Sequence, residues 1–322
     1  MKALIISILA LLSWTSEPTL DASCQTGAAD GIVEKAVKEG NSLSNTGRDE
    51  EAMASFERAL ALESKNIEAR RGEVDSAIKL ALKARKAGDM DGALVYLARA
   101  RKSVPNNPTL LLDFGVQADL LKLYRDADEA LTQALAMRPD DPQIIYAMGR
   151  VKLDEQRLPE AEQYLRKYIA FQPNDPTAHY GLGHILRLTL KDEEAQAELH
   201  QSIKLQPAQT ESYYELGIIA AEHDAEDEAV SQFQIVTKRN PEHGGALAGL
   251  GMIAYKRKNY IEAVELLKHS IRSAPDYVEA HRYLGMALAK LGRNAESAQQ
   301  LAIADELAKE QTRLQHGFVL EK

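Results

Sequence analysis

The sequences PNNP at 105–108, PDDP at 139–142 and PNDP at 173–176 are copies of one short signal, each placed 34 residues after the last. Prolines continue the same step along the chain, at Pro105, Pro139, Pro173, Pro207, Pro241 and Pro275. Glycines keep this step from Gly115 to Gly285, and alanines keep it from Ala127 to Ala263. Self-similarity at a fixed period of this size is typical of proteins built from stacked repeats.

The signal predicts where helices end and begin. Its first proline ends a helix, because proline lacks an amide donor and clashes with the preceding turn. Asn107, Asp141 or Asp175 is then expected to cap the next helix, whose first turn holds the second proline.

Between two signals the apolar residues form two helical stripes. In residues 244–277 the first stripe recurs at i, i+3, i+4 and i+7, and the second follows the polar pair Lys258-Asn259. The first contains Leu247, Leu250, Gly251 and Ala254, and the second contains Ala263, Leu266, Leu267, Ser270 and Ile271. Each unit is therefore predicted to be a helical hairpin. Its fixed glycine and alanine let the two helices approach, where a larger side chain would cost about 1–3 kcal/mol.

The period divides the chain into about eight units, at 33–66, 74–107, 108–141, 142–175, 176–209, 210–243, 244–277 and 278–311. Residues 67–73 are surplus to the period. Seven residues make about two helical turns, so we expect them to extend the next helix at its start. The last unit has Lys309 in place of proline, so its second helix is expected to run on from Ala295 to Arg313 as a cap. Residues 25–32 are expected to form a linker and residues 314–322 a frayed tail.

The first 24 residues are expected to form a leader. Met1-Lys2 precedes the apolar run ALIISILALLSW at 3–14, which fits a secretory signal and is too short to span a bilayer. The alternative is a first helix of the array, but this run has no polar face and Pro18 follows it. LDASC at 20–24 loosely resembles a lipoprotein box, so Cys24 is a candidate for lipidation, with a free thiol as the alternative. We expect an exported protein, either periplasmic, secreted or envelope-associated, with membrane contact through this leader or a lipid anchor.

Composition restricts the function further. The net charge of −9 argues against general binding of nucleic acid or anionic lipid, which needs a basic face. The single cysteine excludes an intrachain disulfide. Aromatic residues make up 6% of the chain, and the Ala and Leu that replace them favour helices.

Glycine, alanine and proline at these offsets in a 34-residue helix pair resemble the tetratricopeptide repeat, as do Tyr213 and Phe233 at two of its large-residue positions. The resemblance covers residues 33 to about 311. It implies an all-α protein, a right-handed α-solenoid of stacked helix-turn-helix repeats with a C-terminal capping helix. The tryptophan frequent in this family is absent from the repeats. His179 and His281 are among the residues in its place, and we expect them in the core or at its boundary.

The resemblance also implies that the fifth, ninth, twelfth and thirteenth positions of each first helix line a concave groove. Tyrosines fill the fifth position in three successive units, and arginine and histidine lie beside them. Both tyrosine and arginine are frequent binding hot spots. The candidate partner-binding residues are Tyr146, Arg150, Tyr180, His184, Arg187, Tyr214 and Tyr255. The alternative for the tyrosines is packing against the adjacent unit.

No catalytic constellation emerges from the sequence. It has no Gly-x-Ser-x-Gly, no glycine-rich phosphate loop and no His-Glu-x-x-His. We therefore expect no enzyme activity, no cofactor and no metal site. The sequence predicts a scaffold of the cell envelope that binds a peptide or protein in its groove. The alternative is a structural or assembly subunit of a secretion, pilus or polysaccharide-export complex.

Overall fold

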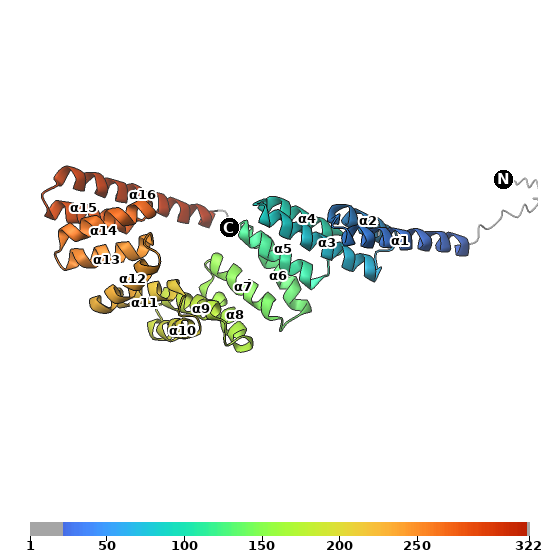
Figure 1. The fold of residues 1–322 in the computed structure, drawn as a ribbon, viewed down its shortest axis with the longest axis horizontal. Coiled ribbons are helices and arrows are strands. Elements are labelled where there is room, and N and C mark those ends of the chain that lie inside the picture. The colour runs from blue at the N-terminus through green and yellow to red at the C-terminus, as the bar shows by residue number, and fades with distance from the viewer. Residues whose placement is uncertain (1–21, 321–322) are drawn as a thin grey trace, which may run out of the picture. The chain divides into compact units, whose positions relative to one another are not determined.

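The computed structural model describes the backbone of residues 22–320 and the side-chain surroundings of residues 31–313. All regular secondary structure in that part is α-helical, and the helices follow one another in antiparallel pairs (Figure 1). The predicted all-α repeat architecture is confirmed. The apolar run of the expected leader lies outside the described residues.

Contacts group the helices into two compact units, which divide between Leu123 and Tyr124. The N-terminal unit contains α1 (Ala22–Asn45), α2 (Asp49–Leu62), α3 (Ile67–Lys86), α4 (Met90–Ser103) and α5 (Pro108–Leu120). The C-terminal unit contains α6 (Tyr124–Met137), α7 (Pro142–Asp154), α8 (Leu158–Phe171), α9 (Pro176–Leu188), α10 (Asp192–Leu205), α11 (Thr210–Glu222), α12 (Glu226–Arg239), α13 (Gly244–Lys256), α14 (Tyr260–Ser273), α15 (Val278–Lys290) and α16 (Asn294–Leu320). A repeat array has no core common to all its repeats, because each repeat packs only against its neighbours.

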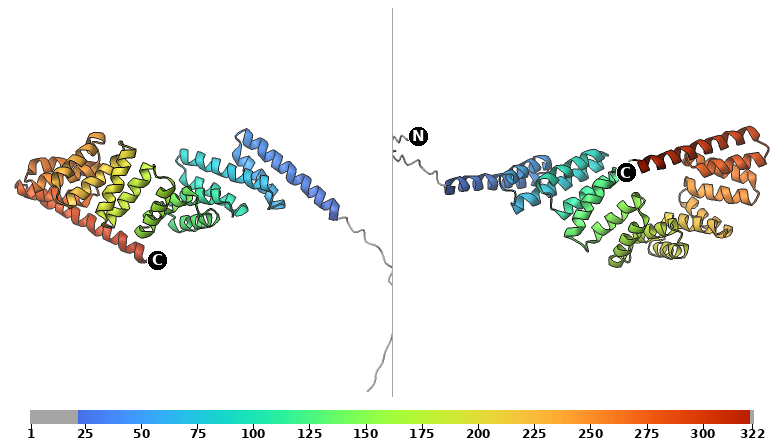
Figure 2. Two further views of the ribbon diagram at one scale, coloured as in Figure 1. Left: turned by 90° about the horizontal axis from the view of Figure 1, so that it is seen from below. Right: turned by 180° about the vertical axis from the view of Figure 1, so that it is seen from behind.

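The core of the C-terminal unit passes from one repeat to the next. One apolar cluster joins Leu165, Leu182, Leu199 and Leu216, which come from four consecutive helices. The first helices α9, α11, α13 and α15 also contact one another in succession. Figure 2 shows these helices side by side. A continuous row of first helices is therefore available to carry a binding surface.

The expected caps are present at the inter-repeat signals. The side chain of Asn107 accepts a hydrogen bond from the amide of Leu110 at 3.0 Å. Asp141 accepts from the amide of Gln143 at 3.0 Å, and Asp175 accepts from that of Thr177 at 2.9 Å. In each case a proline follows in the first turn of the helix.

Every hairpin turn passes through one residue in the left-handed region, at the fifteenth position of its repeat. These residues have φ between 55° and 81° and are Gly47, Gly88, Lys122, Gln156, Leu190, Asp224, Lys258 and Gly292. A left-handed residue just after a helix lets the next amides bond back to its last carbonyls. In the turn of Gln156, for example, the amide of Arg157 bonds to the carbonyl of Lys152 at 2.8 Å.

The seven-residue insert forms the start of α3. This helix begins at Ile67 and has 20 residues, whereas α5, α7, α9, α11, α13 and α15 have 13 each. Asn66 caps it by accepting a hydrogen bond from the amide of Ala69 at 2.9 Å. The insert therefore adds two turns to the helix.

Both ends of the array are more helical than expected. Residues 25–32, predicted as a linker, lie within α1, and residues 314–320, predicted as a frayed tail, lie within α16. Once a helix has formed, each added residue gains a hydrogen bond, so a helix continues until a strong stop signal. No proline stands in either segment. No helix in the described part of the chain has both the length and the apolar character needed to cross a bilayer.

Candidate functional site

The candidate binding residues lie on the first helices of four consecutive repeats in the C-terminal unit. Tyr146 and Arg150 are on α7, three more are on α9 (Tyr180, His184 and Arg187), Tyr214 is on α11 and Tyr255 is on α13. We call the side of α7, α9, α11 and α13 that carries these residues, together with the same side of α15, the first-helix face. Arg150 is exposed and the other six are half-buried.

A buried carboxylate links two of these helices. Glu215 on α11 is 3% exposed, and its Oε1 lies 2.9 Å from Nδ1 of His184. Its Oε2 accepts a hydrogen bond from Nε of Arg187. The ring of Tyr180 stacks on that of His184, with centroids 6.2 Å apart. The structure therefore brings three predicted residues together around a fourth that the sequence analysis did not select.

The surroundings of Glu215 favour its ionised form. Burial works to raise the pKa, but the hydrogen bond from His184 and the charge of Arg187 outweigh it, so the pKa lies below its usual value. Arg187 has a second carboxylate nearby, since its Nη1 lies 3.9 Å from Oε1 of Glu222. The carboxylates of α11 therefore balance the charge of Arg187.

The same pairing occurs in the N-terminal unit. Arg85 and Arg187 both occupy the twelfth position of a repeat, and Asp113 and Glu215 both occupy the sixth position of the following one. Nη2 of Arg85 lies 3.3 Å from Oδ1 of Asp113. A pair repeated between successive first helices indicates a packing role for the twelfth-position arginines.

The tyrosine row is largely part of the core. Tyr146 and Tyr180 pack against one buried cluster and Tyr214 against the next. Burial raises the pKa of Tyr180 to about 12. The ring of Tyr214 lies 4.6 Å from that of His243, and its hydroxyl occupies the space where a Cβ on Gly245 would lie. These contacts fit the alternative interpretation, in which the tyrosines pack between repeats.

The remaining two candidates are more open. Tyr255 contacts the rings of Tyr260 and Tyr283, each at 5.6 Å between centroids. Nη2 of Arg150 lies 4.0 Å from Oδ2 of Asp154 on the same helix. Arg150 therefore has an acidic neighbour within its own repeat.

Sequence reasoning missed one feature of this face and left a second out of its candidates, although the resemblance implies that the ninth positions line the groove. Glu215 could have been found, because it is a carboxylate at the sixth position, where Ala147, Gly181 and Gly249 are small. The second feature is an apolar row at the ninth position, formed by half-buried Ile218, Met252 and Met286 in three successive repeats. The sequence indicates this row by the 34-residue spacing of its three apolar residues.

His179 and His281 are buried, which confirms the expectation that they belong to the core. Nε2 of His179 lies 2.9 Å from the carbonyl of Pro173, and Nε2 of His281 lies 2.9 Å from that of Pro275. Nδ1 of each meets a side chain of the second helix, Glu198 at 2.6 Å and Gln300 at 2.7 Å. Each histidine thus joins both helices of its hairpin to the preceding turn.

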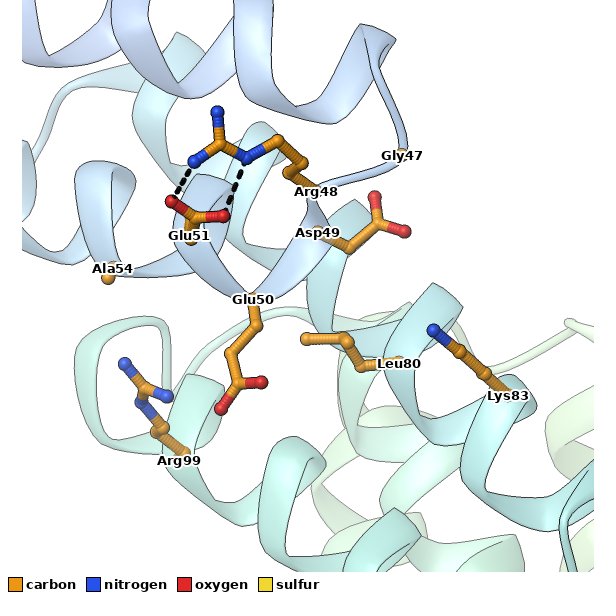
Figure 3. Close-up of a pocket in the computed structure, with 9 residues that line it drawn as sticks. All are labelled: Gly47, Arg48, Asp49, Glu50, Glu51, Ala54, Leu80, Lys83 and Arg99. Carbon is orange, nitrogen blue, oxygen red and sulfur yellow. Dashed lines mark hydrogen bonds and ion pairs between the residues drawn. The ribbon is translucent and has the colours of Figure 1, made fainter.

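A cavity of about 450 Å³ lies in the N-terminal unit, where the start of α2 faces α3 and α4 (Figure 3). Its lining mixes both signs of charge, and Arg48 and Glu51 pair with each other within it. Arg99 at its edge is paired with Glu57. In the described residues, no group of three or more His, Cys, Asp or Glu side chains is placed to hold a metal ion.

Sequence comparison decides the family. Models of the tetratricopeptide repeat match residues 37–66, 120–185, 226–277 and 260–310, which together span more than half of the chain. The chain belongs to the tetratricopeptide repeat family. Proteins of this family are typically non-catalytic scaffolds that bind protein or peptide partners.

Solved structures of other proteins are similar to parts of this chain. A tetratricopeptide repeat protein from Parabacteroides merdae is 16% identical, with a TM-score of 0.54 over 80% of this chain and 99% of that one. The protein YrrB, described as having an unusual peptide-binding site, is 23% identical, with a TM-score of 0.46 over 57% of this chain and 95% of its own. No curated protein sequence matched this one.

Proposed function

We propose that this protein is a non-enzymatic scaffold that binds an apolar segment of a partner protein on the first-helix face of its C-terminal unit. The observation that carries the proposal is the row of Ile218, Met252 and Met286, which remains partly exposed on successive first helices. Methionine adapts its shape to different apolar partners, which suits it to a binding surface.

The charged side chains on this face already have acidic neighbours, which favours an apolar partner segment over a partner carboxylate. Arg187 and His184 are held by Glu215, and Arg150 lies beside Asp154. A partner carboxylate would have to compete with these internal acids, and displacing them would leave buried Glu215 without its partners, at a cost of several kcal/mol. Apolar side chains placed on the ninth-position row face no such competition.

The test is a selection from a random 12-residue peptide library against the immobilised full chain. We expect the enriched peptides to be rich in apolar residues. Their binding should fall at least tenfold in the double variant Met252→Ser with Met286→Ser, because the row then loses its apolar area. Tyr180 and Arg187 are poor targets here, since changing them would disturb packing between α9 and α11.

Ile261→Ser is the matched control. Ile261 is an exposed apolar residue on α14, a second helix, and its replacement should leave peptide binding unchanged. Enrichment of acidic peptides would contradict the proposed chemistry. Full binding by the double methionine variant would contradict the proposed face.

The location of this scaffold is a further part of the proposal. We infer that it acts outside the cytoplasm, in the periplasm or cell envelope, on the basis of the basic start and apolar run at residues 1–14. Cys24 lies near the start of α1, and its lipidation stays a prediction. A scaffold in this location would meet its partner among exported or membrane-attached proteins.

A further inference from the structure

The insert places an acidic residue at a core position of α3. Counted from Ile67, which follows unit 33–66 without a gap, Glu73 is the seventh residue of its repeat. The seventh residues of the later first helices are all large and apolar: Phe114, Met148, Leu182, Leu216, Leu250 and Leu284. Glu73 is therefore an exception to the pattern of the array.

Packing against α2 shows that this count is the relevant one. A Cβ on Gly72 would lie 2.3 Å from the ring of Phe56, and a Cβ on Gly249 would lie 2.5 Å from the ring of Phe233. Both phenylalanines are the twenty-fourth residue of a repeat, and both glycines are the sixth residue of the next when α3 is counted from Ile67. When α3 is counted from Ile67, it therefore packs against α2 as α13 packs against α12. In this count Glu73 occupies a core position.

The side chain of Glu73 is fully enclosed and poorly partnered. Its exposed fraction is 0%, and neither carboxyl oxygen makes a hydrogen bond of normal geometry in the described structure, although the Ser103 hydroxyl is close enough to act on it. The cation acting on it is Arg99 of α4, which already bonds to Glu57 of α2 through Nε at 2.6 Å and Nη2 at 2.5 Å. The guanidinium of Arg99 is therefore committed to a different carboxylate.

We propose that Glu73 makes the packing of α3 against α2 and α4 sensitive to pH, firm while the carboxyl is protonated and loosened when it ionises. An ionised carboxylate without partners is costly to keep away from water. Opening of these helices lets water reach it.

Electrostatics determine the direction of this pH response and the pH range over which it occurs. Burial raises the pKa of Glu73 from 4.5 to about 7; the nearby Ser103 hydroxyl and the charge of Arg99 oppose this shift, and the charge of Glu57 adds to it. Because the pKa is higher in the folded state, the stability tied to this proton is complete below pH 4.5. That stability is lost as the pH rises, and the loss levels off above about pH 7.

Amide hydrogen exchange on the full chain tests the proposal. After correction for the intrinsic rate, the opening constant in α2, α3 and α4 should rise roughly a hundredfold between pH 5 and pH 8, about tenfold for each pH unit below 7. Amides in α13 and α14 of the C-terminal unit serve as an internal reference. In Glu73→Gln the pH response should disappear, because an amide of similar shape does not ionise.

Two further variants sharpen the result. Glu73→Leu restores the side chain found at this position in most other repeats, so it should remove the pH response and increase protection at pH 8. Glu39→Gln is the matched control, because Glu39 is the seventh residue of the first repeat but is exposed and pairs with Arg58. An unchanged pH response in Glu73→Gln, or a wild-type protein whose protection does not change with pH, would overturn the proposal.

Discussion

Leu190 lies in a backbone conformation that suits glycine better than leucine. Its φ is 58° and its side chain is 83% exposed, so the conformation is not compensated by burial. A non-glycine residue costs about 1–2 kcal/mol in this region, and glycine loses about 0.5–1 kcal/mol through the extra freedom of the unfolded chain. We therefore expect Leu190→Gly to stabilise the C-terminal unit by about 0.5–1 kcal/mol, measured as a higher urea midpoint.

Gly292 provides the reverse substitution in the same unit. It occupies the equivalent turn with φ of 74°, and an added Cβ would have no neighbour within 4 Å. Gly292→Ala should therefore lower the free energy of unfolding by about 1 kcal/mol through backbone strain alone, which would appear as a lower urea midpoint. A lower midpoint for Leu190→Gly would mean that the exposed leucine contributes a contact that outweighs the strain.

At the level of helix pairs, one aromatic ring fixes the distance between three helices. Phe233 on α12 lies between Gly217 on α11 and Gly249 on α13, and a Cβ on either glycine would come within 2.6 Å of the ring. Gly249→Ala should therefore push α13 away from α12. We expect a loss of about 1–3 kcal/mol in urea unfolding, with helicity by circular dichroism retained.

Gly181 is the matched control for this substitution. It is also the sixth residue of its repeat, but there a Cβ would lie 3.3 Å from the end of the flexible Leu165 side chain, which has to move by only a few tenths of an ångström. Alanine is favoured over glycine inside a helix by about 1 kcal/mol, so Gly181→Ala should be neutral or stabilising. Equal losses at the two sites would show that Phe233 can move aside.

The sequence allowed the helix pairs to be predicted but not all contacts between them. The hairpins and their caps follow from prolines, glycines and acidic caps that recur within each repeat. The left-handed turn was marked by glycine only at Gly47, Gly88 and Gly292; of the five other residues there, only Asp224 is of a type that favours a positive φ. The pairing of Arg187 with Glu215 depends on how two first helices face each other, which periodicity along one helix does not specify.

Across the whole molecule, two buried carboxylates give the units opposite responses to pH. Glu73 favours the folded N-terminal unit at low pH, because its pKa is raised. Glu215 favours the folded C-terminal unit at higher pH, because its pKa is lowered; that stability is present above the unfolded value of 4.5 and is lost as the pH falls. A single melting curve would mix the two responses, so each unit has to be followed through its own amides.

The proposed N-terminal leader gives a prediction for the molecule in the cell. Residues 1–30, fused to a reporter that is active only after export, should give activity if the basic start and apolar run form the secretory signal that we propose. The control fusion carries Ile6→Asp and Leu9→Asp, which interrupt the apolar run and should abolish the activity. Equal activity of the two fusions, or none from the first, would contradict export. If a lipid is attached at Cys24, Cys24→Ala in the full chain should move the protein from the membrane fraction to the soluble fraction, while export itself continues.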